Sequence, residues 1–188
     1  LEKSKYIREK EIFKTMRTQL QKDLQEVSSL EKAKTSASFF KTGKGQYGEG
    51  DIFIGVTVPE QRTIAKKYSS LSFKDLEILL KSKIHEFRLT ALIILMNKFK
   101  QTKNAEEKKN IFDFYVKNRK GINNWDLVDI SAPQIPGAYL LDRDKTILYT
   151  LAQSKDLWEK RIAIISTLAF IRNGSYTDTV QISEMLLH

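Results

Sequence analysis

Apolar residues recur at steps of three and four along most of the chain, the spacing that places side chains on one face of an α-helix. Near the start this pattern predicts a long amphipathic helix over residues 6–28, whose apolar stripe is Phe13, Met16, Leu20, Leu24 and Val27. The same periodicity predicts further helices over residues 31–41, 85–100, 104–118, 123–131, 142–153, 156–172 and 177–187. We therefore expect an all-α protein.

Two more helix starts are marked by capping signatures. Thr57 stands at an N-cap position, with Pro59 in the first turn, where its missing N–H costs nothing. Ser72 and Asp75 follow the S-x-x-D order of a capping box. These residues predict helices that begin just after positions 57 and 72.

Residues 42–57 break the helical pattern, because they hold five of the eight glycines in the chain. We expect one long loop there. Two short runs in and at the end of this loop resemble strands, and both are too short to make a sheet: residues 52–54 and 56–58.

An internal repeat links three of the predicted helices. Residues 86–95 align with residues 159–168, which lie 73 positions later, and half that spacing leads from Arg88 to Trp125 and on to Arg161. This period is typical of HEAT-type helix pairs, which repeat every ~40 residues and stack into a solenoid. We expect one HEAT-like domain over residues 1–188, a right-handed α-solenoid with these three residues on its concave face. The apolar end at residues 185–187 suggests a chain truncated at its C-terminus, since a solenoid end normally needs a capping repeat.

The chain is basic, with 32 Lys and Arg against 23 Asp and Glu and a net charge of +9. A positive field attracts polyanions, of which nucleic acid is the commonest. The absence of cysteine excludes disulfides, thiolate metal sites and cysteine nucleophiles. No apolar run approaches the ~20 residues of a membrane span, and no apolar signal region is seen at the N-terminus, so we expect a cytoplasmic protein.

The segment Asn124 to Asp129 gathers an indole and two carboxylates within little more than one helical turn. Trp125 and Asp129 are four residues apart, so they share a helix face and could meet one cationic group together. The alternative is a core aromatic beside a surface or capping carboxylate. Asp126 lies about 100° round the helix from Trp125, which favours a supporting or capping role.

Other polar residues have more modest interpretations. His85, at a helix start, suits a cap or a hydrogen bond between repeats. The glycine-rich residues 43–48 lack the order of a P-loop, which argues against nucleotide binding, whereas Lys41 and Lys44 could contact phosphates. A lysine run reads as a solvated helix connection: Lys98, Lys100, Lys103, Lys108 and Lys109.

Taken together, several segments resemble a known family, the bacterial DNA alkylation repair glycosylases built from HEAT-like repeats. The resemblance runs from about residue 30 to residue 172. It is carried by FFKTG at 39–43, QYGEGDIFIGV at 46–56, Pro59, Arg62, HEFR at 85–88, NWDLVD at 124–129 and WEKR at 158–161.

This resemblance implies a DNA glycosylase that excises N3- and N7-alkylated purines from double-stranded DNA without a metal or an organic cofactor. It assigns the catalytic roles to three residues, Asp129, Trp125 and Arg161. The DNA contacts are expected from Lys41, Lys44, Phe39, Arg88 and Trp158. Phe39 stands where the family often has Tyr, so a hydroxyl contact is lost there. We expect the protein to act as a monomer.

The residues themselves are suited to this chemistry. A cationic purine leaves as a neutral base, so one carboxylate, Asp129, could stabilise the positive charge that develops on the sugar and orient water. Trp125 would pack on the sugar or the lesion, and Arg161 would hold a phosphate. The alternative for Arg161 is a salt bridge to Glu159 or to a neighbouring helix. Two other classes remain open, a non-catalytic protein that binds damaged or structured DNA and a HEAT adaptor for protein partners.

Overall fold

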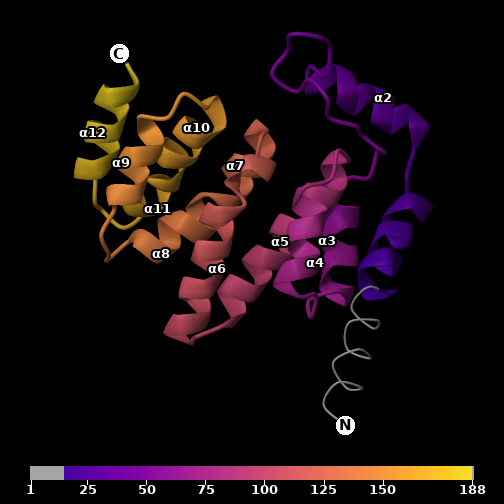
Figure 1. Ribbon diagram of the computed structural model, residues 1–188, viewed down its shortest axis with the longest axis horizontal. Helices are drawn as coiled ribbons and strands as arrows, with labels where there is room; N and C mark the ends of the chain where they lie inside the picture. Colours follow the sequence, from indigo (N-terminus) through magenta and orange to yellow (C-terminus); the bar gives the residue numbers. More distant parts are fainter. Residues whose placement is uncertain (1–14, 188) are drawn as a thin grey trace. The chain divides into compact units, whose positions relative to one another are not determined.

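The computed structural model describes residues 15–187, and within them the chain is helical (Figure 1). After a helix over residues 15–26, the elements are α2 (Leu30–Phe39), α3 (Val58–Lys67), α4 (Phe73–Leu80), α5 (His85–Gln101), α6 (Ala105–Lys117), η1 (Arg119–Gly121), α7 (Trp125–Ser131), η2 (Pro133–Gly137), α8 (Ala138–Leu140), α9 (Thr146–Ala152), α10 (Leu157–Ser166), α11 (Leu168–Ile171) and α12 (Thr177–Leu186). Over the described residues the β-structure is limited to a single bridge between Ile52 and Ile84. The all-α prediction is confirmed.

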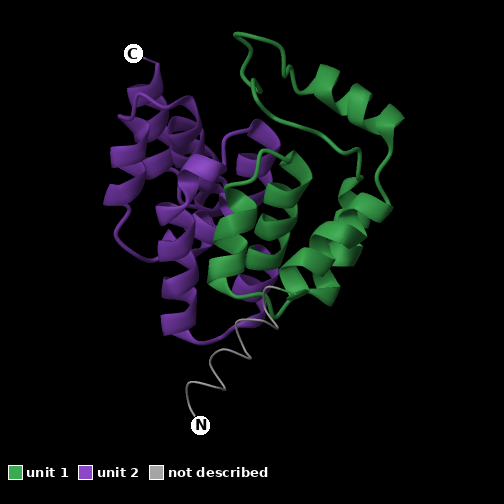
Figure 2. Ribbon diagram, turned by 45° about the vertical axis from the view of Figure 1, so that its right-hand side comes forward, with its two compact units in different colours: residues 1–95 green, residues 96–188 purple. Residues whose placement is uncertain are grey.

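The chain divides into two compact units, residues 1–95 and residues 96–188 (Figure 2). Helix α5 continues through the division between Leu95 and Met96. In the part of the chain that the structure describes, no helix combines the length and the apolar composition that crossing a membrane requires.

The predicted helix over residues 6–28 is described from residue 15, where it is helical as far as residue 26. Its two central leucines, Leu20 and Leu24, are fully buried as the apolar stripe predicts, but Val27 lies past the end of the helix and is 40% exposed, so the stripe is shorter than predicted. The part of the prediction that includes Phe13 lies outside the described residues.

Both capping predictions are confirmed in unit 1. Thr57 is the N-cap of α3, and its backbone N–H donates to the Glu60 carboxylate at 2.7 Å. Ser72 is the N-cap of α4, and its hydroxyl accepts from the Asp75 N–H at 3.2 Å. These are local interactions, which explains why the sequence alone could indicate them.

A buried carboxylate fixes the end of the long loop in unit 1. Glu86 is 2% exposed and accepts hydrogen bonds from the N–H groups of Ile54, Gly55 and Val56, at 3.0, 2.7 and 3.4 Å. Gly55 has φ 77°, and a Cβ there would lie 2.1 Å from the Ser29 carbonyl oxygen. Only glycine therefore fits this position, and the loop is held against both α2 and α5.

Unit 2 contains two short helical segments that the sequence pattern did not predict, η2 and α8. They follow α7 directly and include Pro133 and Pro136, which normally mark a break in a helix. A Cβ on Gly137 would lie 2.3 Å from the Ser166 carbonyl oxygen. The missing side chain thus lets η2 approach α10 closely, and α10 also packs against α7 and α9. The predicted helix over 156–172 is divided into α10 and α11 at Thr167.

Candidate functional site

An ion pair joins α7 and α10 in unit 2. The Arg161 guanidinium donates from Nε to Asp129 Oδ1 at 2.8 Å and from Nη2 to Asp129 Oδ2 at 2.7 Å. Both side chains are about one-third exposed, at 37% for Arg161 and 36% for Asp129. The pair is therefore a two-pronged contact that solvent and a ligand can reach.

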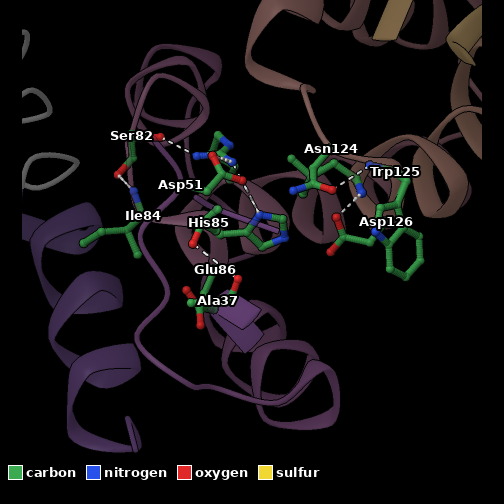
Figure 3. A network of polar contacts seen from close by, with 12 residues as sticks. Ala37, Asp51, Ser82, Ile84, His85, Glu86, Asn124, Trp125 and Asp126 are labelled. Carbon is green, nitrogen blue, oxygen red and sulfur yellow. Dashed lines mark hydrogen bonds and ion pairs between the residues drawn. The ribbon is translucent and has the colours of Figure 1, made fainter. Parts of the chain in front are cut away.

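The start of α7 is set by polar groups from its own sequence. Asn124 is fully buried as the N-cap, and its side-chain oxygen accepts from the Trp125 N–H at 2.8 Å. The Asp126 carboxylate accepts from the Leu127 N–H, also at 2.8 Å, which agrees with the supporting role expected for it. Figure 3 shows this arrangement around Asn124, Trp125 and Asp126. These contacts orient the first turn of the helix that carries Asp129.

The other end of α7 is fixed by a buried contact to α6. Ser131 donates to the Leu127 carbonyl oxygen, and its hydroxyl lies 2.9 Å from that of Tyr115. Burial raises the pKa of the Tyr115 hydroxyl well above its ordinary range, so this group stays neutral. Because both ends of α7 are held, the backbone that carries Trp125 and Asp129 is well defined.

Two tryptophans stand one turn before the members of the ion pair. Trp125 is the first residue of α7 and precedes Asp129 by four positions, while Trp158 is in the first turn of α10 and precedes Arg161 by three. Both indoles are partly exposed. Since residues at these spacings share a helix face, each helix offers an aromatic ring beside a charged group. The four residues expected in unit 2 thus lie on two helices that pack together.

A second set of ion pairs surrounds the start of α10. Glu159 is buried and accepts from Arg119 Nε at 2.9 Å, while Lys120 Nζ lies 2.9 Å from both Glu159 and Asp156. Burial alone would raise the pKa of each carboxyl, but the hydrogen bonds and nearby cations outweigh it and lower the pKa of Asp156 and of Glu159. Glu159 is thereby engaged by Arg119 and Lys120. Arg161 instead forms the other contact that the sequence left open, a salt bridge to a neighbouring helix, through Asp129 of α7.

The electrostatics of the Asp129–Arg161 pair favour the charged form of the arginine. The hydrogen bonds that Arg161 donates to Asp129 raise the pKa of the Arg161 guanidinium, partial burial opposes this shift, and the carboxylate charge adds to it. The pair therefore presents one fixed cation and one acceptor group at a partly exposed surface.

Three residues expected to contact DNA lie at the end of α2 in unit 1. Phe39 is 64% exposed, and Lys41 and Lys44 are exposed in the loop that follows. Lys41 has φ 52°, a left-handed conformation, and its carbonyl oxygen accepts from the Gly48 N–H at 3.2 Å. A Cβ on Gly48 would lie 2.3 Å from the Phe40 carbonyl oxygen. The loop is thus folded on itself by close backbone contacts, with its basic side chains outward.

Arg88 lies inside unit 1 and not at its surface. It is 3% exposed, its Nη2 donates to Asp51 Oδ1 at 2.7 Å, and its Nη1 donates to the Ser82 carbonyl oxygen at 2.8 Å. A direct contact with DNA would require this buried pair to break. Arg88 and Arg161 are related by the repeat spacing, but Arg88 is buried and Arg161 is partly exposed. Repeat spacing does not determine which acidic residue an arginine pairs with.

His85 belongs to the same cluster. Its Nδ1 lies 3.1 Å from Asp51 Oδ2, and its ring stacks on Phe53 with 4.5 Å between centroids. Figure 3 shows Asp51, Ser82 and His85 gathered at the start of α5. His85 therefore contacts a residue of the long loop, Asp51, where the sequence predicted a cap or a hydrogen bond between repeats. Among the residues described, no group of three His, Asp or Glu side chains could hold a metal ion.

A family model described as DNA alkylation repair enzyme matches residues 20–188. No curated protein matches the chain.

Proposed function

Because the chain belongs to the DNA alkylation repair enzyme family, we propose that it is a DNA glycosylase that removes cationic N3- and N7-alkylated purines from duplex DNA. The family supports a role in DNA repair and an enzymatic activity. The observation that carries the finer proposal is the partly exposed Asp129 carboxylate, held by Arg161 and four residues after Trp125.

The proposed reaction needs one carboxylate and no general acid. The bond between C1′ of the deoxyribose and N9 of the purine breaks, and its electron pair neutralises the positive charge of the alkylated base. Positive charge develops on the sugar, where the Asp129 carboxylate stabilises it. A water molecule then bonds to C1′ and releases one proton, which Asp129 accepts or directs to solvent. The products are the free alkylated base and an abasic sugar.

Arg161 is suited to positioning both the DNA and Asp129. Its Nε and Nη2 face the carboxylate, and Nη1 makes no hydrogen bond or ion pair with the residues that the structure describes. Nη1 can therefore donate to a phosphate oxygen while the pair with Asp129 stays intact. In this arrangement Arg161 bridges the DNA backbone and the carboxylate, which brings Asp129 beside the adjoining sugar.

The tryptophans would supply the apolar and aromatic contacts of the same site. Trp125 shares a helix face with Asp129, so its ring can pack on the sugar or the cationic lesion, worth about 0.5–2 kcal/mol depending on desolvation. Trp158 would contact DNA beside Arg161, and Phe39, Lys41 and Lys44 would do so from unit 1. For Arg88 we propose an indirect role, in which it holds Asp51 and so supports the loop that bears these lysines.

For the architecture we propose HEAT-like helix pairs in a right-handed solenoid. The repeat between residues 86–95 and 159–168 supports it, since the first segment lies in α5, the second covers most of α10 and reaches the start of α11, and a short helix precedes each of them, α4 and α9. Small-angle scattering of the purified chain tests this arrangement, because a solenoid gives an elongated profile and a globule does not.

The activity is tested by incubating the protein with duplex DNA that carries N7-methylguanine and measuring the released base by chromatography. We expect release from the alkylated duplex and none from an undamaged duplex of the same sequence. Tight binding of the alkylated duplex without release would support the alternative proposal, a non-catalytic HEAT-repeat protein that binds damaged or structured DNA. In that case the Asp129–Arg161 pair would be a structural link between α7 and α10.

A further inference from the structure

The sequence predicted that the run of lysines between residues 98 and 109 is a solvated helix connection. In the structure these lysines lie in different environments. Lys109 Nζ pairs with Asp113 at 2.6 Å on the surface of α6. Lys98 is half-buried, and desolvation lowers the pKa of its ammonium group despite the opposing charge of Glu107. Lys100 and Lys108 instead line one groove. The run is therefore not a uniform solvated face.

This groove lies within unit 2 and has a volume of about 370 Å³. It is bordered by the last turn of α5, the start of α6, η2 with α8, and the end of α11. Three cationic side chains line it, those of Lys100, Lys108 and Arg172, together with the apolar side chains of Met96 and Phe99. None of the residues that line the groove is acidic. The groove is also distinct from the candidate site, because Asp129 and Arg161 are not among its lining residues.

The three cations are not neutralised within the fold. Across the described residues, none of Lys100, Lys108 and Arg172 has an ion-pair partner. Lys108 Nζ lies 5.3 Å from the centroid of the Phe99 ring, so a cation–π contact joins two residues that line the groove. Like charges that line one groove repel each other, and this cost falls when an anion binds between them.

Two neutral amide side chains lie beside the cations, and each is bonded to the backbone four residues earlier in the chain. The Gln134 side chain donates its N–H to the Ile130 carbonyl oxygen at 3.0 Å, and the Asn173 side chain donates to the Ala169 carbonyl oxygen at 2.8 Å. Both residues line the groove. Each amide keeps further hydrogen-bonding capacity beside the three cations.

We infer that this groove binds phosphate groups of the DNA backbone, at a contact separate from the Asp129–Arg161 site. The inference rests on the proposed action on DNA. An open groove with three unpaired cations and no acid suits a backbone that passes over it, whereas a small molecule is usually enclosed by its pocket. Such a contact carries no base preference, so it would position the duplex and leave recognition of the lesion to the other site.

The test compares the salt dependence of binding to an undamaged duplex. Each lost phosphate contact should lower the slope of log K against log salt concentration by about one, so Lys100→Ala/Lys108→Ala/Arg172→Ala should lower it by about three. A matched variant that removes the same charge elsewhere, Lys66→Ala/Lys74→Ala/Lys103→Ala, should have a smaller effect, because these exposed lysines do not line the groove. Melting temperatures of both variants confirm that they are folded.

Three results would overturn the inference. The first is an equal loss of slope in both triple variants, which would indicate a general charge effect. The second is a slope that stays unchanged in the groove variant. The third is binding of inorganic pyrophosphate in the groove, detected by calorimetry and lost in the groove variant, with DNA binding intact. Because undamaged DNA is used, the outcome does not depend on whether the protein excises a base.

Discussion

The guanidinium of Arg161 donates to both carboxylate oxygens of Asp129, across the packed helices α7 and α10. In the proposed function this contact has a use beyond stability, since it orients the carboxylate and leaves Nη1 for a phosphate. The same contact also admits a purely structural interpretation. The two interpretations predict different effects when Arg161 is changed.

Arg161→Ala should weaken duplex binding and slow base release, while changing the free energy of unfolding by no more than about 1 kcal/mol, because the pair is partly exposed. Arg161→Lys should fall between the wild type and Arg161→Ala, since lysine keeps the charge but loses the two-pronged geometry. Fluorescence anisotropy, single-turnover release and urea denaturation measure the three quantities. A large loss of stability with normal binding and release would favour the structural interpretation.

Gly137→Ala should destabilise unit 2. The added Cβ would lie 2.3 Å from the Ser166 carbonyl oxygen, so η2 and α10 would have to move apart, at a cost of about 1–3 kcal/mol. Base release should fall with stability, because α10 carries Arg161. Gly43→Ala is the control, since its Cβ would meet only the flexible side chain of Gln46. Equal urea midpoints for the two variants would contradict the proposed close approach of η2 to α10.

Acid should weaken the network at the start of α10. The pKa values of Asp156 and Glu159 are lowered in the folded protein from ordinary values of 3.8 and 4.5. Their stabilising contribution is therefore complete above those values and is lost as the pH falls through the lower, folded pKa values. Lys120→Ala removes a cation from both carboxylates, so its melting temperature should depend less on pH below about pH 5 than that of the wild type.

Lys103→Ala provides the control for this pH series. It removes the same charge from an exposed position that has no ion pair in the described part of the chain. Its melting temperature should follow the wild-type pH dependence. If both variants lose the same dependence on pH, the effect comes from net charge and not from the Lys120 contacts.

The local features of this fold could be read from the sequence, whereas the contacts between distant segments could not. The caps at Thr57 and Ser72 depend on residues three positions away, and the sequence indicated both. The segment η2 was missed because Pro133 and Pro136 usually end a helix, and here they are contained in a π-helix. A local pattern cannot show that packing against α10 supports this segment.

The candidate site shows the same distinction. The shared face of Trp125 and Asp129 follows from helical spacing, but the bond from Arg161 to Asp129 joins residues that are 32 positions apart. The repeat spacing suggested equivalent roles for Arg88 and Arg161. Their roles differ, because Arg88 is buried in its ion pair with Asp51, a residue of the long loop. Only the packing of the chain decides which acid each arginine meets.

The central claim, that the Asp129 charge stabilises the reacting sugar, is tested most directly by single-turnover release of N7-methylguanine by Asp129→Asn. The substitution keeps the size of the side chain and removes its charge, so release should slow at least ~100-fold, about 2.7 kcal/mol in the barrier, with little change in duplex binding. Asp126→Asn is the matched control, because Asp126 lies on the same helix and its oxygen, which caps Leu127, is retained in Asn. Release by Asp129→Asn at the wild-type rate would contradict the claim.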